Sequence, residues 1–244
     1  MVPPSVEDED VGTLHFNDEE EVPSHLLKYW HQRYDIFSKY DDGIRLTNNA
    51  WFGVTPEPVA HQIATDIAHL APPTKRILID LFAGAGGNAI AFALSGRWDA
   101  IYAIERDPAT LECGRHNAAL YGVGAEITWI EGDCFKVIEE QLAEVCGEAV
   151  LFASPPWGGP EYVGRKIFDV EGMEPYGLGE LYGGFGGRGG QVVLFLPRTA
   201  NLNQLAGVVG EGEGRVLVRH YCMTGFSKGL CVFYGKWEDP TQDG

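Results

Sequence analysis

Five short apolar runs, separated by segments of helical length, limit the folds open to this chain of 244 residues. The runs are 76–82, 100–104, 125–131, 149–153 and 191–196. Their length and apolar character are typical of buried parallel strands, so the alternation predicts an α/β fold with helices on both faces of the sheet. Two later runs, 214–222 and 229–235, predict an antiparallel hairpin at the edge of a mostly parallel seven-stranded sheet.

The segments before the first strand divide into a tail and a lobe. Residues 1–22 are poor in apolar side chains and contain eight carboxylates but no Lys or Arg, which predicts a disordered acidic tail. Residues 23–73 predict a small N-terminal helical lobe. Its last helix reaches about Leu70, with Thr55 as N-cap and Pro56 as first residue. The core follows at 74–237, and 238–244 form a second tail.

An aromatic stripe in this lobe falls at helical spacing and indicates a packing face. Its members are Leu26, Tyr29, Trp30, Tyr34 and Phe37.

The net charge of −17 disfavours proteins that bind long nucleic-acid duplexes, which carry a basic face. Outside the acidic tail the charge is −9, and a protein that holds only the end of an RNA needs just a few local cations. The five cysteines are scattered, which predicts neither a disulfide framework nor structural zinc, and we find no metal-binding pattern. No apolar run approaches the roughly 20 residues of a transmembrane helix, so we expect no membrane partner.

A glycine-rich turn follows the first strand, over residues 80–88, and Glu105 ends the second strand where it can accept from two ribose hydroxyls. A nicotinamide dinucleotide is compatible, although Ala89 stands where the third glycine is usual. Asp80 favours a different cofactor, because a carboxylate repels a pyrophosphate but attracts the ammonium group of methionine. With Asp133 after the third strand as an acceptor for an adenine amino group, the pattern predicts S-adenosylmethionine.

The sequence Ser154-Pro155-Pro156-Trp157 follows the fourth strand, at the sheet edge where ligands bind. Two prolines remove N–H donors and leave carbonyls free to accept. The Ser154 hydroxyl and the Pro155 carbonyl can receive both hydrogens of an exocyclic amino group, while Trp157 offers a face to its ring. This predicts methyl transfer to a planar amine; the alternative is a proline-rich turn with a buried Trp.

A glycine-rich stretch, 177–190, stands where a helix is expected before the fifth strand. We expect it to form a mobile loop over the site. Its single Arg188 between glycines is weak evidence for an RNA-binding segment.

Taken together, several segments resemble the trimethylguanosine synthase family over roughly residues 26–236. They are 80–88, 154–162, 195–198, and 28–34 with 41–44 and 54–57. The resemblance implies a class I Rossmann-like methyltransferase whose N-terminal lobe folds over the site. It implies methyl transfer from S-adenosylmethionine to N2 of the 7-methylguanosine cap of small nuclear and nucleolar RNA, giving 2,2,7-trimethylguanosine. It also implies a monomer in the nucleus and nucleolus, with the cytoplasm as a further location.

The resemblance also implies roles for individual residues. The cofactor would be lined by Phe37, Thr55, Asp80, Gly84, Glu105, Asp133 and Ser154. Trp157 would stack on the methylated base, and Ser154 and Pro155 would face its amino group, so these three residues are the expected catalytic set. The rest of the cap would meet Lys28, Arg198 and Asn117, the two cations binding its phosphates.

Two other functions remain open from the sequence. An amino methyltransferase acting on adenine, cytosine or a glutamine side chain uses the same chemistry after the fourth strand, but its motif usually starts with Asn or Asp. A non-catalytic 7-methylguanosine cap-binding module is the alternative from a different class. The presence of Asp80, Glu105 and Ser154 argues against that module.

Overall fold

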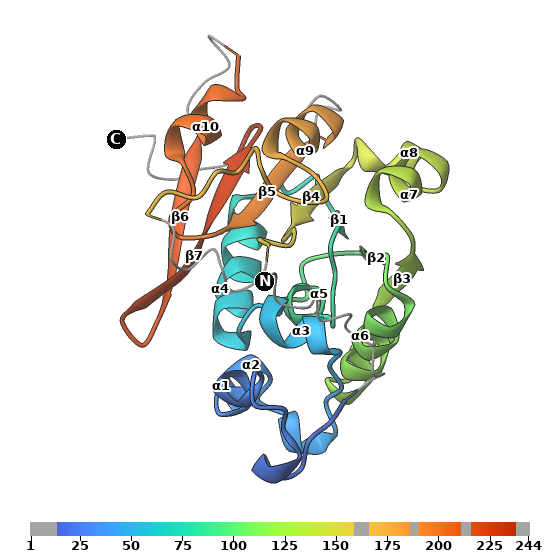
Figure 1. Cartoon of the computed structure of the whole chain (residues 1–244). Helices are drawn as coiled ribbons and strands as arrows, with labels where there is room; N and C mark the ends of the chain where they lie inside the picture. Colours follow the sequence, from blue (N-terminus) through green and yellow to red (C-terminus); the bar gives the residue numbers. More distant parts are fainter. Residues whose placement is uncertain (1–13, 159–165, 186–189, 211–215, 238–244) are drawn as a thin grey trace.

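The computed structural model describes residues 14–158, 166–185, 190–210 and 216–237 (Figure 1). Its strands are β1 (Ile77–Asp80), β2 (Ala100–Glu105), β3 (Ile127–Glu131), β4 (Ala149–Ala153), β5 (Gln191–Leu196), β6 (Leu217–Met223) and β7 (Phe226–Tyr234). They form one sheet in the order β3-β2-β1-β4-β5-β7-β6. β1 to β5 are parallel, and β7 runs antiparallel to both β5 and β6. The predicted α/β fold with an antiparallel edge hairpin is confirmed.

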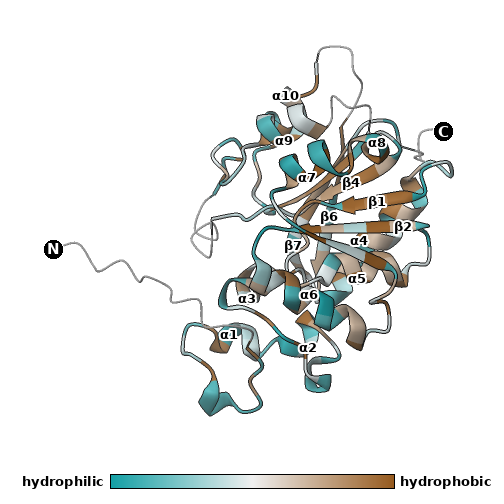
Figure 2. Ribbon diagram, turned by 90° about the vertical axis from the view of Figure 1, so that its right-hand side faces the viewer, coloured by the Kyte–Doolittle hydropathy of each residue, from teal (hydrophilic) through white to brown (hydrophobic). Residues whose placement is uncertain are grey.

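Two helical layers cover the sheet. One contains α4 (Glu57–Leu70), α5 (Gly87–Leu94) and α6 (Pro108–Leu120); the other contains α7 (Cys134–Glu140), α8 (Ala143–Cys146), α9 (Leu178–Phe185) and α10 (Leu202–Gly207). Successive strand residues enter opposite layers: Leu78 packs in the first core and Ile79 in the second. This two-sided burial explains why β4 is apolar along its length and β1 is apolar up to Asp80 at its end (Figure 2).

The N-terminal lobe, blue in Figure 1, contains α1 (Leu27–Trp30), α2 (Arg33–Ile36) and α3 (Asn48–Gly53). The aromatic stripe therefore spans two short helices. Leu26, Trp30 and Phe37 are buried as predicted, whereas Tyr34 is exposed. The lobe thus packs through most of the stripe. Helix α4, which was expected to be the last helix of this lobe, instead packs against α5 and β6 in the first layer on the sheet.

The predicted boundary of the acidic tail is wrong. Leu14 exchanges two backbone hydrogen bonds with Leu46, and the Phe16 N–H donates to the Tyr40 hydroxyl. Phe16 and Val22 are buried, so a few apolar side chains hold residues 14–22 on the lobe in spite of their charged neighbours. The rest of that segment, 1–13, and the tail 238–244 lie outside the described residues.

Two local predictions need correction. Helix α4 begins at Glu57 with Pro56 as its N-cap residue, and Thr55 instead accepts a hydrogen bond from the Asn88 side chain. The glycine-rich stretch contains helix α9 rather than only a loop. Leu178, Leu181 and Phe185 are buried at helical spacing, and burial of this face outweighs the low helix propensity of glycine.

Glycine is required within α9 at position 184. A Cβ atom there would collide with the Phe135 ring, which stacks on Phe185 with its centroid 4.6 Å away. Residues 186–189, including Arg188, lie outside the described chain.

Candidate active site

A cavity of 920 Å³ lies between the lobe and the carboxyl ends of β1 to β5. Its walls on the core side are the segments that follow each of these strands, and the lobe adds residues from α1, α3 and the approach to α4. This is the edge at which parallel α/β sheets bind ligands, and the volume suits a cofactor together with part of a substrate.

The glycine-rich turn after β1 is held by Glu105. Gly84 and Gly86 have φ values of +54° and +96°, which L side chains rarely adopt. The Glu105 carboxylate accepts from the Gly84 N–H at 3.0 Å and from the Asp107 N–H at 2.9 Å. Burial raises the pKa of Glu105. Because each carboxylate oxygen has a second lone pair, Glu105 can still accept from a ligand at the cavity wall.

Asp80 lies behind this turn, fully buried, and does not itself line the cavity. One carboxylate oxygen accepts from the Phe82 N–H at 3.3 Å, and the other has no hydrogen-bond partner among the residues the structure describes. Burial raises the pKa of Asp80 to about 7. A buried carboxylate oxygen without a donor among the described residues, just before the cavity-lining segment that begins at Leu81, would suit a ligand that brings a cationic donor.

Asp133 lines the cavity at the end of β3, as predicted, but both its oxygens have partners. One oxygen caps α7 by accepting from the N–H groups of Phe135 and Lys136 at 3.1 and 3.3 Å. The other accepts from the Tyr176 hydroxyl. Tyr176 also lines the cavity, and its proximity to Asp133 was not visible in the sequence because the two are 43 positions apart.

Ser154, Pro155, Pro156 and Trp157 all line the same cavity as the glycine-rich turn. The indole N–H of Trp157 donates to the Phe195 carbonyl at 3.3 Å, and the two rings are 5.4 Å apart at 57°. The hydrogen bond and the ring contact together fix the plane of the indole against β5. The remainder of the motif, residues 159–162, lies outside the described chain.

On the lobe side, two of the predicted residues line the cavity and a third does not. Lys28 and Thr55 line the cavity, and the Thr55 hydroxyl accepts from Asn88 at 3.0 Å. Phe37 does not line it: only 2% of this residue is exposed, and its ring packs against Tyr121. Helix α2 ends at Ile36, so the chain turns Phe37 into the core and leaves Ile36 on the cavity wall.

The prediction that Asn117 contacts the cap is wrong. Asn117 is fully buried in α6 and outside the cavity lining. Its side-chain oxygen accepts from the Arg45 N–H at 2.9 Å, and its NH₂ group donates to the carbonyls of Arg45 at 2.9 Å and Ala85 at 3.0 Å. These bonds use the polar groups of the amide, so Asn117 joins the lobe to the core instead of binding a ligand.

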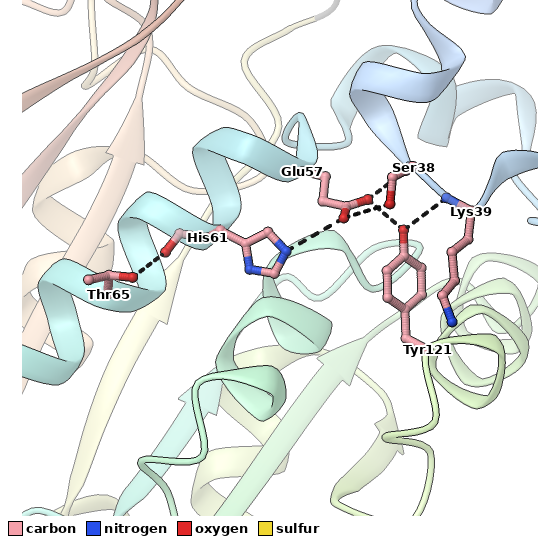
Figure 3. A network of polar contacts seen from close by, with 6 residues as sticks. All are labelled: Ser38, Lys39, Glu57, His61, Thr65 and Tyr121. Atoms are coloured by element: carbon pink, nitrogen blue, oxygen red, sulfur yellow. Dashed lines mark hydrogen bonds and ion pairs between the residues drawn. The ribbon is translucent and has the colours of Figure 1, made fainter.

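A second joint lies around Glu57 (Figure 3). Its carboxylate accepts from the Ser38 N–H at 2.6 Å, the Ser38 hydroxyl at 2.9 Å and the Tyr121 hydroxyl at 2.5 Å. His61 Nε2 lies 3.6 Å from the same carboxylate. Burial alone raises the pKa of Glu57, but the hydrogen bonds from Tyr121 and Ser38 outweigh it and the net pKa is lowered. The cavity wall formed by the lobe is thereby held on α4 and α6.

Most of the positive and negative side chains around the cavity lie on different sides of it. Carboxylates line it near β2 and β3, at Glu105, Asp107 and Asp133, whereas Arg198 and Lys228 line it beside β5 and β7. The lobe adds Lys28, and Arg106 also faces the cavity. Lys28 and Arg198 were expected; Lys228 was missed because residues 223–228 were interpreted as a loop between two strands. One half therefore favours hydroxyl and ammonium groups, and the other favours anions.

Among the described residues, no group of three His, Cys, Asp or Glu side chains lies close enough to hold a metal ion. A search of the same residues finds no helix with the length and apolarity needed to cross a membrane.

Comparisons with known proteins agree with this geometry. The family model of RNA cap guanine-N2 methyltransferases matches residues 75–237. The trimethylguanosine synthase of Schizosaccharomyces pombe is 33% identical over 214 residues, covering 87% of each chain. That of Saccharomyces cerevisiae is 34% identical over 216 residues, covering 86% of this chain and 68% of the yeast protein.

Solved structures support the fold alone. A Porphyromonas gingivalis W83 protein superposes with a TM-score of 0.62 at 16% identity, over 88% of this chain and 51% of that one. The human methyltransferase 10 domain containing protein gives 0.50 at 16% identity, over 91% and 98%. Since the family model matches residues 75–237 and the two synthases align over 87% and 86% of the chain, this chain belongs to the RNA cap guanine-N2 methyltransferase family.

Proposed function

We propose that this protein transfers methyl groups from S-adenosylmethionine to N2 of the 7-methylguanosine cap of small nuclear and nucleolar RNA, giving 2,2,7-trimethylguanosine. One observation carries the proposal: the Ser154–Trp157 motif and the glycine-rich turn with Asp80 behind it meet at a single cavity. The family membership and the two yeast trimethylguanosine synthases support the same reaction.

The acidic half of the cavity suits the cofactor. One Asp80 oxygen has no donor among the residues that the structure describes, and the ammonium group of the methionine moiety would supply one. Glu105 would accept from ribose hydroxyls, and Asp133, with Thr55 and Gly84 on neighbouring walls, would border the rest of the nucleoside. When bound, S-adenosylmethionine supplies an electrophilic methyl group on a positively charged sulfur.

The motif after β4 suits the cap base. A 7-methylated guanine is positively charged, so the Trp157 indole would attract it by a cation–π interaction of about 1–2 kcal/mol beyond ordinary stacking. Trp157 is well suited to this role because its hydrogen bond to Phe195 holds the ring in place before a ligand arrives. The same charge would make the site discriminate against unmethylated guanosine.

The catalytic contribution of the protein would be positioning. The exocyclic amine of guanine is a poor nucleophile because its lone pair is delocalised into the ring. The Ser154 hydroxyl and the Pro155 carbonyl would accept its two hydrogens and aim the lone pair at the methyl group. The proton can leave after transfer, so no strong base is needed. Lys28 and Arg198, from opposite walls, would hold the cap phosphates.

Methyl transfer from labelled S-adenosylmethionine to m7GTP, with GTP, adenosine and cytidine compounds and a glutamine peptide in parallel, tests the proposal. Products are resolved by mass. We expect label on N2 of m7GTP and none on GTP. Transfer only to another amine would indicate the more general amino methyltransferase, and binding of m7GTP without transfer would indicate a cap-binding module.

The proposed substrates also lead us to expect a location. We infer that the protein acts as a monomer in the nucleus and nucleolus, with the cytoplasm as a further location. Light scattering of the purified chain and microscopy of a tagged copy test these two points. A stable dimer, or exclusion from the nucleus, would contradict them.

A further inference from the structure

The tip of the β6–β7 hairpin, residues 223–228, carries an aromatic ring that the proposed reaction does not use. Phe226 is 71% exposed, yet it lines the cavity together with Ser227 and Lys228. Because most of this ring is accessible to solvent on the cavity lining, it is available to stack on a ligand.

A β-bulge places these three consecutive residues on one cavity. In a regular strand, side chains alternate between the faces, so Ser227 would point away from its neighbours. Here Tyr221 pairs with Gly229 and Cys222 pairs with Ser227, which leaves Lys228 as the extra residue. Bulges re-aim side chains in this way and recur beside functional sites.

The turn at the tip is also constrained. Thr224 and Gly225 have φ values of +51° and +82°, as a two-residue hairpin turn requires. A β-branched residue is rare in this conformation, so the tight turn is maintained at a cost in backbone energy.

The hairpin packs against Phe195, which contacts the proposed base platform, Trp157. A Cβ atom on Gly229 would lie 2.6 Å from the Phe195 ring and 2.8 Å from the Leu196 carbonyl, so only glycine permits this approach. Phe195 in turn contacts Trp157 through its ring and its carbonyl. The position of the tip is therefore set relative to the indole that would bind the cap base.

The charge of the tip suits an anion. The chain has 35 acidic and 18 basic residues, yet no carboxylate of the described segments forms an ion pair with Lys228. Arg198 lies alongside, its guanidinium 3.5 Å from the Ser227 carbonyl. An exposed ring and two cations on the lining of one cavity can together bind a single-stranded nucleotide by stacking and phosphate contact.

We propose that the hairpin tip binds the first nucleotide of the RNA chain attached to the cap, an inference that depends on the proposed function. The ring of Phe226 stacks on its base, and Lys228 contacts the phosphate that follows it. The site thereby distinguishes a capped RNA from a free cap nucleotide.

The test compares a capped five-nucleotide RNA with m7GTP, which has no attached nucleotide. The readout is the ratio of kcat/KM for the capped RNA to kcat/KM for m7GTP. We expect Phe226→Ala to lower this ratio about tenfold, the effect of losing one stacked base, and Phe226→Trp to restore it. Leu202→Ala is the matched control, because Leu202 is 55% exposed on α10 and outside the cavity lining; it leaves the ratio unchanged.

Lys228→Gln provides a second, independent measurement. Losing one phosphate contact reduces the slope of log K against log salt for the capped RNA by about 0.7. Lys236→Gln, the same charge change beyond the other end of β7, leaves the slope as it is in the unmodified protein.

The outcomes separate the two proposals. If m7GTP is methylated but Phe226→Ala leaves the ratio unchanged, the hairpin inference is overturned and the proposed function stands. An equal loss for both substrates would also overturn it, since the ring would then serve the fold or the cap itself. If m7GTP receives no methyl group, the proposed function fails and the inference fails with it.

Discussion

The side-chain amide of Asn117 pairs with the backbone of Arg45 through two hydrogen bonds of 2.9 Å, one donated and one accepted. A third bond, to the Ala85 carbonyl at 3.0 Å, ties the same amide to the glycine-rich turn. One buried side chain thus connects the lobe, helix α6 and the wall of the cavity. Polar groups paired this way tolerate little displacement, because a broken pair leaves a buried donor or acceptor unsatisfied.

Replacing Asn117 should loosen the lobe. We expect Asn117→Leu to lower the free energy of unfolding by about 1–3 kcal/mol, because the N–H of Arg45 and two carbonyls lose their partners. Thermal unfolding measures the loss, and hydrogen exchange at the Arg45 amide reports whether the lobe opens. Arg115→Ala, an exposed change on the same helix, is the control. Unaltered exchange at Arg45 would contradict the role of Asn117 as a joint.

The Glu57 joint should weaken in acid. Since the pKa of Glu57 is lowered on folding, its stabilising effect is present above the ordinary pKa and is lost as the pH falls through the folded value. Glu57→Gln should therefore destabilise the protein by about 1 kcal/mol at pH 7 and by less at pH 4. Denaturant unfolding at both pH values measures this. A loss that is the same at both would exclude the carboxylate charge as the cause.

The affinity for S-adenosylmethionine should depend on pH through Asp80. With a pKa of about 7 in the ligand-free protein, Asp80 is neutral in acid and cannot pair with an ammonium group. Below pH 7 we expect the affinity to fall up to tenfold for each pH unit, and Asp80→Asn to bind weakly at every pH from 5.5 to 8.5. Titration calorimetry is the measurement. The same pH dependence in Asp80→Asn would assign it to another group.

The same substitution should stabilise the ligand-free protein. The folded pKa of Asp80 lies above its ordinary value of 3.8, so ionisation costs stability progressively as the pH rises from about 4 to about 7. At pH 8 we expect Asp80→Asn to raise the free energy of unfolding by roughly 1–3 kcal/mol. A drop in melting temperature at that pH would show that the carboxylate is satisfied by a partner of its own.

Substitution of Trp157 should impair methylation of the cap without changing the affinity for the cofactor. We expect Trp157→Ala to abolish methylation of m7GTP, while Trp157→Phe retains partial activity with KM raised about tenfold. Both variants should bind S-adenosylmethionine as tightly as the unmodified protein. Full activity in Trp157→Ala would refute stacking on this ring.

Substitution of Gly229 tests how the hairpin packs against Phe195, the neighbour of Trp157. A methyl group at this position would press on Phe195 and the Leu196 carbonyl, so Gly229→Ala should shift Phe195 and tilt Trp157. We expect a loss of about 1–3 kcal/mol in stability and a higher KM for m7GTP. Gly207→Ala, where a Cβ meets open space, is the control. If Gly229→Ala is less stable but its KM for m7GTP is unchanged, packing at this position does not control binding of the cap.

The sheet, the glycine-rich turn and the motif after β4 could all be predicted from sequence patterns. These features are local: continuous apolar runs predict strands buried on both faces, and a turn or proline motif adjoins the strand that positions it. Because the carboxyl ends of parallel strands share one edge, Asp80, Glu105, Asp133 and Ser154 could be predicted to lie close together. Glu105, Asp133 and Ser154 line the cavity at that edge, whereas Asp80 is buried outside its lining. The family resemblance then narrowed the substrate.

Residue positions that depend on contacts between distant segments could be learned only from the folded structure. Asn117 and Phe37 have the residue types and sequence positions expected of ligand-binding residues. In the structure, however, Asn117 pairs with the backbone of Arg45 and Phe37 packs against Tyr121, so both side chains are buried in the core. Lys228 enters the cavity through a one-residue bulge, which changes the direction of a side chain without any signature in composition. Packing between segments more than 70 positions apart, such as those of Arg45 and Asn117, outweighs local propensity. The sequence could therefore identify candidate site residues, but the fold determines which of them line the cavity.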